Sequence, residues 1–267
     1  LVEGIPVTYR AGDQPNNALS LNVLEPGEVA ATGGTSGVVY GIEDRVVYDP
    51  QSRVNGFAHV NHTNKNKRIG ILLCINGAGI QYSWLKHNMT PTDVSYSEME
   101  RLANTIPVGS GGLRILPFGN GAERVLGNKN IGSQINNFHF NLHNQAHFYR
   151  AALEGIAFSF VYGMNILKEM GLNVQIMRVG NDNLFQSDIF SGTISNLVGS
   201  TIEVIETTGA IGAAKASGVA VGIYSNIREA VSDTKLIKSY EPGPKDGAKV
   251  EAYQNWLADL ELRLEYV

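Results

Sequence analysis

Residues 29–40, VAATGGTSGVVY, join two short β-type apolar runs through a turn of glycines and small hydroxyl residues. Glycines let backbone N–H groups approach an anion closely, and the hydroxyls of Thr35 and Ser36 add donors with little bulk. The stretch therefore predicts a β-hairpin whose turn could hold phosphate. Taken alone, these residues are more often an ordinary hairpin turn, so the interpretation depends on the rest of the chain.

The composition indicates a globular protein. The chain has 267 residues, of which 43% are hydrophobic and 17% charged, enough for one large domain or two small ones. A net charge of −4 with scattered Lys and Arg gives no basic surface for nucleic acid, so no nucleic-acid partner is predicted. No apolar run approaches the ~20 residues that span a bilayer, so no membrane association is predicted either.

The single cysteine and the first residues of the chain suggest the cellular compartment of the protein and its relation to a longer chain. Cys74 lies in the apolar run Ile69–Ile75, which predicts a buried strand residue in a reducing compartment and therefore a cytoplasmic location. The start, Leu1 to Gly4, is neither a signal peptide nor an initiator methionine. We therefore expect the chain to be part of a longer protein.

The first half of the chain is predicted to be rich in β-structure. Short apolar runs are separated there by Gly, Asn, Asp and Pro. A polar, weakly helical segment is expected over residues 81–104, and a long loop over 107–132, of the kind that is usually functional or disordered. The predicted strands are Ile5–Thr8, Val29–Thr32, Val38–Tyr40, Val46–Tyr48 and Ile69–Ile75.

The second half alternates helices and strands, which predicts parallel βαβ units. A helix over residues 144–170 is apolar on most sides and is expected to be buried. Ligands in such sheets bind at the carboxyl ends of strands, here Gly180–Asn183 and Glu206–Gly209. The further predicted elements are strands at 174–179 and 201–205, helices at 184–197 and 211–221, and, after the 242–244 linker, a last helix whose apolar stripe packs on the body.

Asp13 is a candidate general base. It stands beside Gln14 in a turn after the first predicted strand, where a carboxylate could accept a proton from a substrate hydroxyl. The alternative is that Asp13 caps a helix over residues 16–21. Position alone leaves both interpretations open.

His139, His143 and His147 recur every four residues, which would put three imidazoles on one face if the following helix extended back that far. Metal ligands use such spacing. No HExxH motif, no carboxylate at ligand spacing and no cysteine accompanies them, so hydrogen bonding at the helix entry is favoured and no metal site is predicted.

Common catalytic and nucleotide motifs are absent. The 34–37 segment, GTSG, lacks the G-x-S-x-G pattern between strand and helix that a nucleophile elbow requires, because a β-type segment follows it. There is no Walker A sequence, and no G-x-G-x-x-G follows a predicted strand. A serine hydrolase is therefore not predicted, and a nucleotide would have to bind by another architecture.

Five segments in order across residues 4–224 resemble the C-terminal half of the FGGY carbohydrate kinases, and most closely the xylulokinase-like members. One segment departs from the family's usual form: residues 179–185 carry a Gly and Asn sequence where three successive glycines are common. The matching segments are AGDQ at 11–14, GTSG at 34–37, LPFGNGAER at 116–124, the helix from His143 to Ala157, and GAIGAA at 209–214.

The resemblance implies an α/β, actin-like ATPase fold of the ribonuclease H-like type, a mixed sheet flanked by helices. It implies a kinase that transfers phosphate from MgATP to a sugar hydroxyl, with D-xylulose as the first-choice substrate. By the same resemblance Asp13 would be the general base and Gln14 a sugar contact. The ATP-binding residues would be Gly34, Thr35 and Ser36 at the phosphates, and Gly121, Gly180, Asn183 and Gly209 at the nucleoside.

The family's N-terminal domain, with its phosphate hairpin and most sugar contacts, has no counterpart in residues 1–267. We therefore expect this chain to be the C-terminal, ATP-binding domain of a longer kinase, inactive alone, and a homodimer is a family expectation. The alternatives are a kinase for ribulose, rhamnulose, fuculose, gluconate or glycerol, a nucleotide-binding module that transfers no phosphate, or a structural domain in which the GGTSG segment is only a turn.

Overall fold

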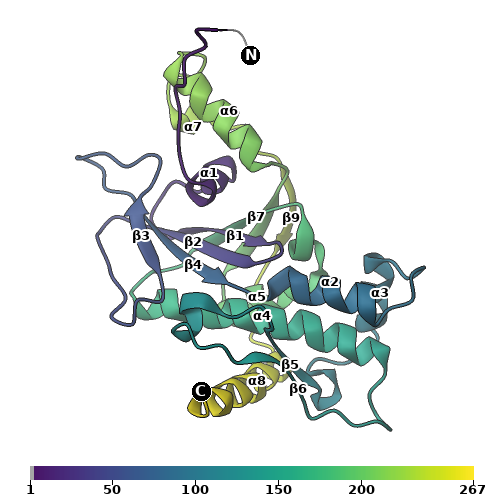
Figure 1. Cartoon of the computed structure of the whole chain (residues 1–267). Helices are drawn as coiled ribbons and strands as arrows, with labels where there is room; N and C mark the ends of the chain where they lie inside the picture. The colour runs from purple at the N-terminus through teal and green to yellow at the C-terminus, as the bar shows by residue number, and fades with distance from the viewer. Residues whose placement is uncertain (1–2) are drawn as a thin grey trace.

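A computed structural model describes residues 3–267, whose centre is a seven-stranded sheet (Figure 1). The strand order is β3-β4-β2-β1-β7-β8-β9. β1 is antiparallel to β2 and parallel to β7, and β7 is parallel to β8, as the βαβ pattern predicts. The strands are β1 Glu28–Gly33, β2 Gly37–Glu43, β3 Asn55–Ala58, β4 Ile69–Ile75, β7 Ile176–Gly180, β8 Thr201–Ile205 and β9 Leu236–Tyr240.

Helices cover both faces of this sheet. In Figure 1, α4 crosses beneath the sheet, and α1, α6 and α7 lie above it. The mixed sheet with flanking helices confirms the predicted fold class. The helices are α1 Asp13–Ser20, α2 Ala78–Asn88, α3 Tyr96–Ala103, α4 Gln145–Glu169, α5 Asp188–Val198, α6 Gly209–Ala220, α7 Ile227–Ala230 and α8 Gly247–Glu265, and β5 Arg114–Phe118 pairs with β6 Gly132–Asn136 in a second, two-stranded sheet.

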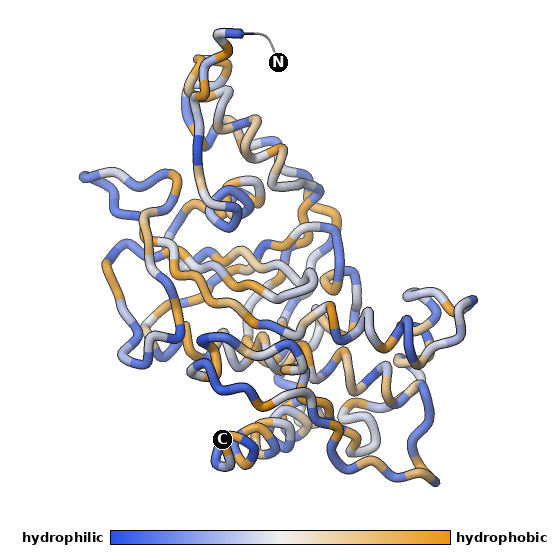
Figure 2. The backbone as a smooth tube through the Cα atoms, in the orientation of Figure 1, coloured by the Kyte–Doolittle hydropathy of each residue, from blue (hydrophilic) through white to orange (hydrophobic). Residues whose placement is uncertain are grey.

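The central strands are buried on both faces. Neighbouring residues of a strand point to opposite sides of the sheet, and helices cover each side. In β1, Val29 and Ala31 belong to the large core that includes α4, whereas Ala30 packs with residues of α1. β2 divides in the same way, with Val39 on the α4 side and Tyr40 on the α1 side. The continuous apolar character of these strands is visible in Figure 2 and is typical of a sheet covered on both sides.

α4 is the buried helix that the sequence predicts. The Asn144 side chain caps its start by accepting the N–H of Ala146. Gly155 lets α4 approach the second sheet, because a Cβ at this position would lie 2.2 Å from the carbonyl oxygen of Ile115. Trp256 of α8 donates its indole N–H to the same oxygen at 2.9 Å. No helix within residues 3–267 is long and apolar enough to cross a membrane.

Two predicted strands are wrong. Residues 5–8 and 46–48 belong to no strand, although each run is apolar. Val7 is 91% exposed and Tyr48 is 82% exposed, so neither run has a sheet neighbour to cover it within the described part of the chain. An apolar run becomes a strand only where another strand accepts its backbone hydrogen bonds. Conversely, the predicted 107–132 loop contains β5, and β3 and β9 were not predicted.

A buried polar pair connects β2 to the segment after β3. The Tyr40 hydroxyl lies 2.9 Å from Nδ1 of His59, and Nε2 of His59 lies 3.1 Å from the carbonyl oxygen of Val23. A neutral imidazole with its proton on Nε2 satisfies both contacts, donating to Val23 and accepting from Tyr40. Burial favours that neutral form and lowers the pKa of His59 from 6.5 to about 4.

We expect His59 to make stability depend on pH. Between pH 6.5 and 4 the unfolded chain binds a proton at His59 that the folded chain does not, so stability falls as the pH falls through this window. The expected loss is about 3 kcal/mol over the whole window. Urea unfolding at several pH values measures it, with His59→Gln as the comparison, because an amide can donate and accept in the same place without titrating. Equal pH slopes for the two proteins would contradict the prediction.

Candidate functional site

The carboxyl ends of three parallel strands meet at one edge of the main sheet. Ala31 of β1 pairs with Val179 of β7, and Gly180 of β7 pairs with Ile205 of β8. The segments that follow these strands therefore emerge side by side. They include the GGTSG turn and the two ligand-binding loops that the sequence predicts at this edge.

The GGTSG segment forms the predicted hairpin turn, with Gly33 as the last residue of β1 and Gly37 as the first of β2. The first turn of α2 holds it in place. The N–H of Gly79 donates to the carbonyl oxygen of Gly34 at 2.9 Å, and the N–H of Ile80 donates to that of Thr35 at 3.2 Å. The donors of the turn thus lie on a backbone that α2 fixes.

Those donors are unused within the chain. No acceptor among residues 3–267 receives a hydrogen bond from the backbone N–H of Gly34, Thr35 or Ser36, and the hydroxyls of Thr35 and Ser36 are likewise without partners there. Both hydroxyl residues are exposed. Free backbone N–H groups beside two hydroxyls are suited to an anion with several oxygens.

A cavity of about 620 Å³ lies beside this turn. Gly34 and Thr35 form one side of it, and Asn183, in the segment after β7, forms another. The remaining lining residues come from within 79–83, 96–100 and 183–187, together with Gly33 and Leu153. The structure therefore brings together three of the residues predicted to bind ATP. Ser36 follows Thr35 in the same turn, and Gly180 ends the strand that leads to Asn183.

Asp13, Gln14 and Gly209 lie outside the lining of this cavity, near the start of α1. Asp13 is the first residue of α1 and is exposed, and its carboxylate accepts the backbone N–H of Gln14 at 2.9 Å. The helix begins earlier than the predicted residue 16, and its N-cap is Gly12. Asn16 donates to the carbonyl oxygen of Gly209 at 2.6 Å, which joins the first turns of α1 and α6.

The end of β4 connects Asp13 with the segment that contains Gly121. Burial raises the pKa of the Cys74 thiol, and the nearby carboxylates of Glu123 and Asp13 raise it further. Asn76, just after β4, donates to Glu123 at 3.2 Å. Glu123 therefore lies at this strand end, and the charge of Asp13 acts on the same thiol. Gly121, two residues before Glu123, is outside the cavity lining, and Cys74 is half-buried.

The three histidines do not share a helical face, because α4 begins at Gln145. His143 accepts the N–H of His139 at 3.0 Å and donates from its other ring nitrogen to Gly111 at 3.1 Å. His147 takes part in the capping box of α4. Hydrogen bonding at the helix entry is thus confirmed. Within residues 3–267 no group of three or more His, Cys, Asp or Glu side chains could hold a metal ion.

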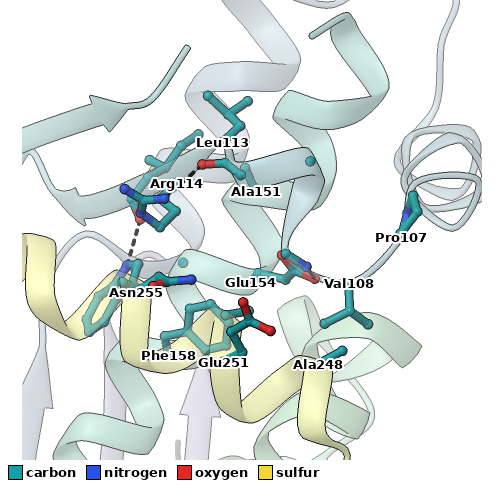
Figure 3. A pocket seen from close by; sticks show the side chains of 17 residues that line it. Pro107, Val108, Leu113, Arg114, Ala151, Glu154, Phe158, Ala248, Glu251 and Asn255 are labelled. Atoms are coloured by element: carbon teal, nitrogen blue, oxygen red, sulfur yellow. Dashed lines mark hydrogen bonds between the residues drawn. The ribbon is translucent and has the colours of Figure 1, made fainter. Parts of the chain in front are cut away.

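A second cavity, of about 260 Å³, lies between α4, α8 and residues 107–115 (Figure 3). Its buried carboxylate, Glu154, already accepts hydrogen bonds from the Gly109 N–H, the Ser110 hydroxyl and Arg150. Arg114 at its rim pairs with Asp259 of α8. Because these charges are satisfied within the protein, the first cavity is the better candidate for ligand binding.

Only some of the residues that line the first cavity could be predicted from the sequence. Gly34, Thr35 and Asn183 could be predicted, whereas Tyr82, Tyr96 and Glu100 could not. These three lie on α2 and α3, in the segment where only a polar, weakly helical region was expected. Their spacing carries no motif, and only the packing of α2 and α3 beside the turn shows that they share a cavity.

Known proteins similar to this chain are sugar kinases. No family model matches it. The xylulose kinase of Bacillus subtilis (strain 168) is 27% identical over 238 residues, which cover 86% of this chain and 45% of that protein. The crystal structure of xylulose kinase from Rhodospirillum rubrum aligns with a TM-score of 0.86 at 20% identity, over 100% of this chain and 53% of that one.

A glycerol kinase has the same fold. The Plasmodium falciparum enzyme, solved with ADP, aligns with a TM-score of 0.81 at 22% identity, over 95% of this chain and 50% of that one. The chain thus spans about half the length of these proteins. The comparisons show that its fold is the one found in half of a sugar kinase.

We expect Gly79→Ala to displace the GGTSG turn. A Cβ at this position would lie 2.4 Å from the carbonyl oxygen of Gly34, so the turn or α2 must shift. The expected results are a loss of about 1–3 kcal/mol of stability and weaker binding of tripolyphosphate, measured by urea unfolding and calorimetry.

Gly192→Ala is the matched control. It lies inside α5, where an added Cβ would meet nothing within 4 Å, and it should raise stability by about 0.5–1 kcal/mol. If Gly79→Ala binds tripolyphosphate as tightly as the unmodified chain, the turn does not depend on its contact with α2.

Proposed function

We propose that this chain is the ATP-binding, C-terminal domain of an FGGY-type carbohydrate kinase, which phosphorylates D-xylulose to D-xylulose 5-phosphate. The observation that carries this proposal is the GGTSG turn. Its hydrogen-bond donors are unused, and it lies beside a large cavity at the carboxyl ends of the parallel strands. The similarity to proteins named xylulose kinase supports the choice of substrate.

The turn would hold the phosphates of ATP. The free N–H groups of Gly34, Thr35 and Ser36 and the two hydroxyls are suited to the β- and γ-phosphate oxygens, where negative charge is spread during phosphoryl transfer. Asn183 lines the same cavity and, with Gly180 at the end of β7, would contact the nucleoside. Gly121 and Gly209 would border the nucleotide from the neighbouring loops.

Asp13 would be the general base. As the sugar oxygen attacks the γ-phosphorus, its proton passes to the carboxylate of Asp13, the new O–P bond forms and the bond to ADP breaks. The side chain is exposed at the start of α1, where a sugar hydroxyl can reach it. Gln14, the next residue, would hydrogen-bond the same sugar.

The residues present fit a magnesium ion carried by ATP. Mg²⁺ usually keeps several waters and takes its other ligands from phosphate oxygens and one or two carboxylates. The carboxylate of Glu123, near the end of β4, would supply one such ligand, and Asp13 would remain free to act as the base. When bound, the ion would neutralise the developing phosphate charge.

The relatives are about twice as long as this chain, and the rest of the sugar site would belong to the other half of a longer protein. The 267-residue chain is then expected to bind nucleotide without turnover, because both walls of the cleft position the reactants. Sugar contacts in that other half would also decide between D-xylulose and the alternatives, which are ribulose, rhamnulose, fuculose, gluconate and glycerol.

Thr35→Val and Asn183→Ala should each weaken binding of a non-hydrolysable ATP analogue about ten-fold, because each removes a polar group from the cavity. Calorimetric titration of the 267-residue chain measures the effect. Thr92→Val, at an exposed threonine outside the cavity, should leave the affinity unchanged. Absence of saturable binding to the unmodified chain would mean that the GGTSG segment is only a turn.

In the longer protein, Asp13→Asn should lower the rate of sugar phosphorylation by about 10²–10⁴-fold while leaving nucleotide affinity intact. A screen over pentuloses, hexuloses and polyols measures the rate, and Asp93→Asn, at an exposed position, serves as the control. Full activity of Asp13→Asn would exclude its role as base. Nucleotide binding without phosphorylation of any sugar would instead indicate a regulatory nucleotide-binding module.

A further inference from the structure

Two tyrosines form one wall of the large cavity. Tyr82 of α2 and Tyr96 of α3 both line it, and their rings are stacked with centroids 5.8 Å apart and an interplanar angle of 29°. Tyr82 is 6% exposed, whereas Tyr96 is 47% exposed. One ring is therefore fixed in the interior, and the other rests on it with much of its surface open.

The inner tyrosine also carries a polar group that the protein leaves unsatisfied. The Tyr82 hydroxyl is buried and has no hydrogen-bond partner among residues 3–267. Burial and the nearby carboxylate of Glu100 raise the pKa of Tyr82, so the hydroxyl keeps its proton and can donate. Buried polar groups without partners are uncommon in native proteins, and one beside a cavity is consistent with a ligand that completes the site.

Glu100 fixes the helix that carries Tyr96 against the start of α5. Its carboxylate accepts the hydroxyl of Ser187 at 2.8 Å and the N–H of Ile189 at 3.1 Å, which ties α3 to the start of α5. Apolar side chains, Ile80 and Leu153 among them, also line the cavity. The cavity therefore combines an aromatic wall and apolar lining with the phosphate-type donors of the GGTSG turn.

A ligand that contacts both the tyrosine wall and the GGTSG turn needs a planar ring that can stack on tyrosine and an anionic group. A nucleoside polyphosphate has both. We infer that Tyr96, supported by Tyr82, is the platform on which the nucleobase stacks and is a determinant of nucleotide affinity. This inference rests on the proposed function, which places the phosphates at the turn. Stacking of a base on an aromatic side chain is strong enough to measure by substitution.

The test compares ATP with tripolyphosphate, which carries the phosphates but no base. Calorimetry on the 267-residue chain should show ATP binding weakened about ten-fold by Tyr96→Ala, with tripolyphosphate affinity changed less than about two-fold. Tyr96→Phe keeps the ring and should bind ATP like the unmodified chain. Tyr48→Ala, which truncates an 82% exposed tyrosine outside the cavity lining, should change neither affinity.

The outcomes separate this inference from the proposed function. If Tyr96→Ala binds ATP as tightly as the unmodified chain, the stacking platform is wrong and the proposed function stands. If Tyr96→Ala loses ATP and tripolyphosphate equally, Tyr96 supports the whole cavity and the stacking role is again wrong. If the unmodified chain binds no ATP, both are overturned.

Discussion

Burial of the central strands on both faces is the constraint on which the rest of this structure depends. β1, β2 and β4 place alternate side chains against α4 on one side and against α1 or its surroundings on the other. A sheet covered in this way can present ligand-binding groups only at its edges and strand ends. The apolar α4, too hydrophobic for a surface helix, supplies much of the cover on one face.

The strand ends become a site because neighbouring helices fix the connecting segments. Two N–H groups from the first turn of α2 hold the carbonyls of the GGTSG turn, so its unused N–H groups lie on a defined backbone. Glu100 then ties α3 to α5 beside the neighbouring cavity. Preorganised donors of this kind bind an anion without first paying to order a loop.

Local patterns predicted much of the fold. The glycine-rich hairpin, the buried α4 and the parallel β7-α5-β8 unit were all recognisable, because alternation and helical spacing act over a few residues. The same reasoning failed for residues 5–8 and 46–48, whose apolar runs have no pairing strand in the described chain, and for β9, whose exposed residues show no clear alternation.

The sequence by itself determined which residues could serve a phosphate-binding turn, because glycine and small hydroxyl residues have that capacity in any fold. It also marked Asp13 as a carboxylate that could act as a base, without showing that it begins α1 or what it would meet. Only the tertiary structure decided that Thr35 and Asn183, 148 positions apart by their residue numbers, line one cavity with Tyr82 and Tyr96. The physical reason is that strand pairing and helix packing join segments whose sequences carry no information about each other's position.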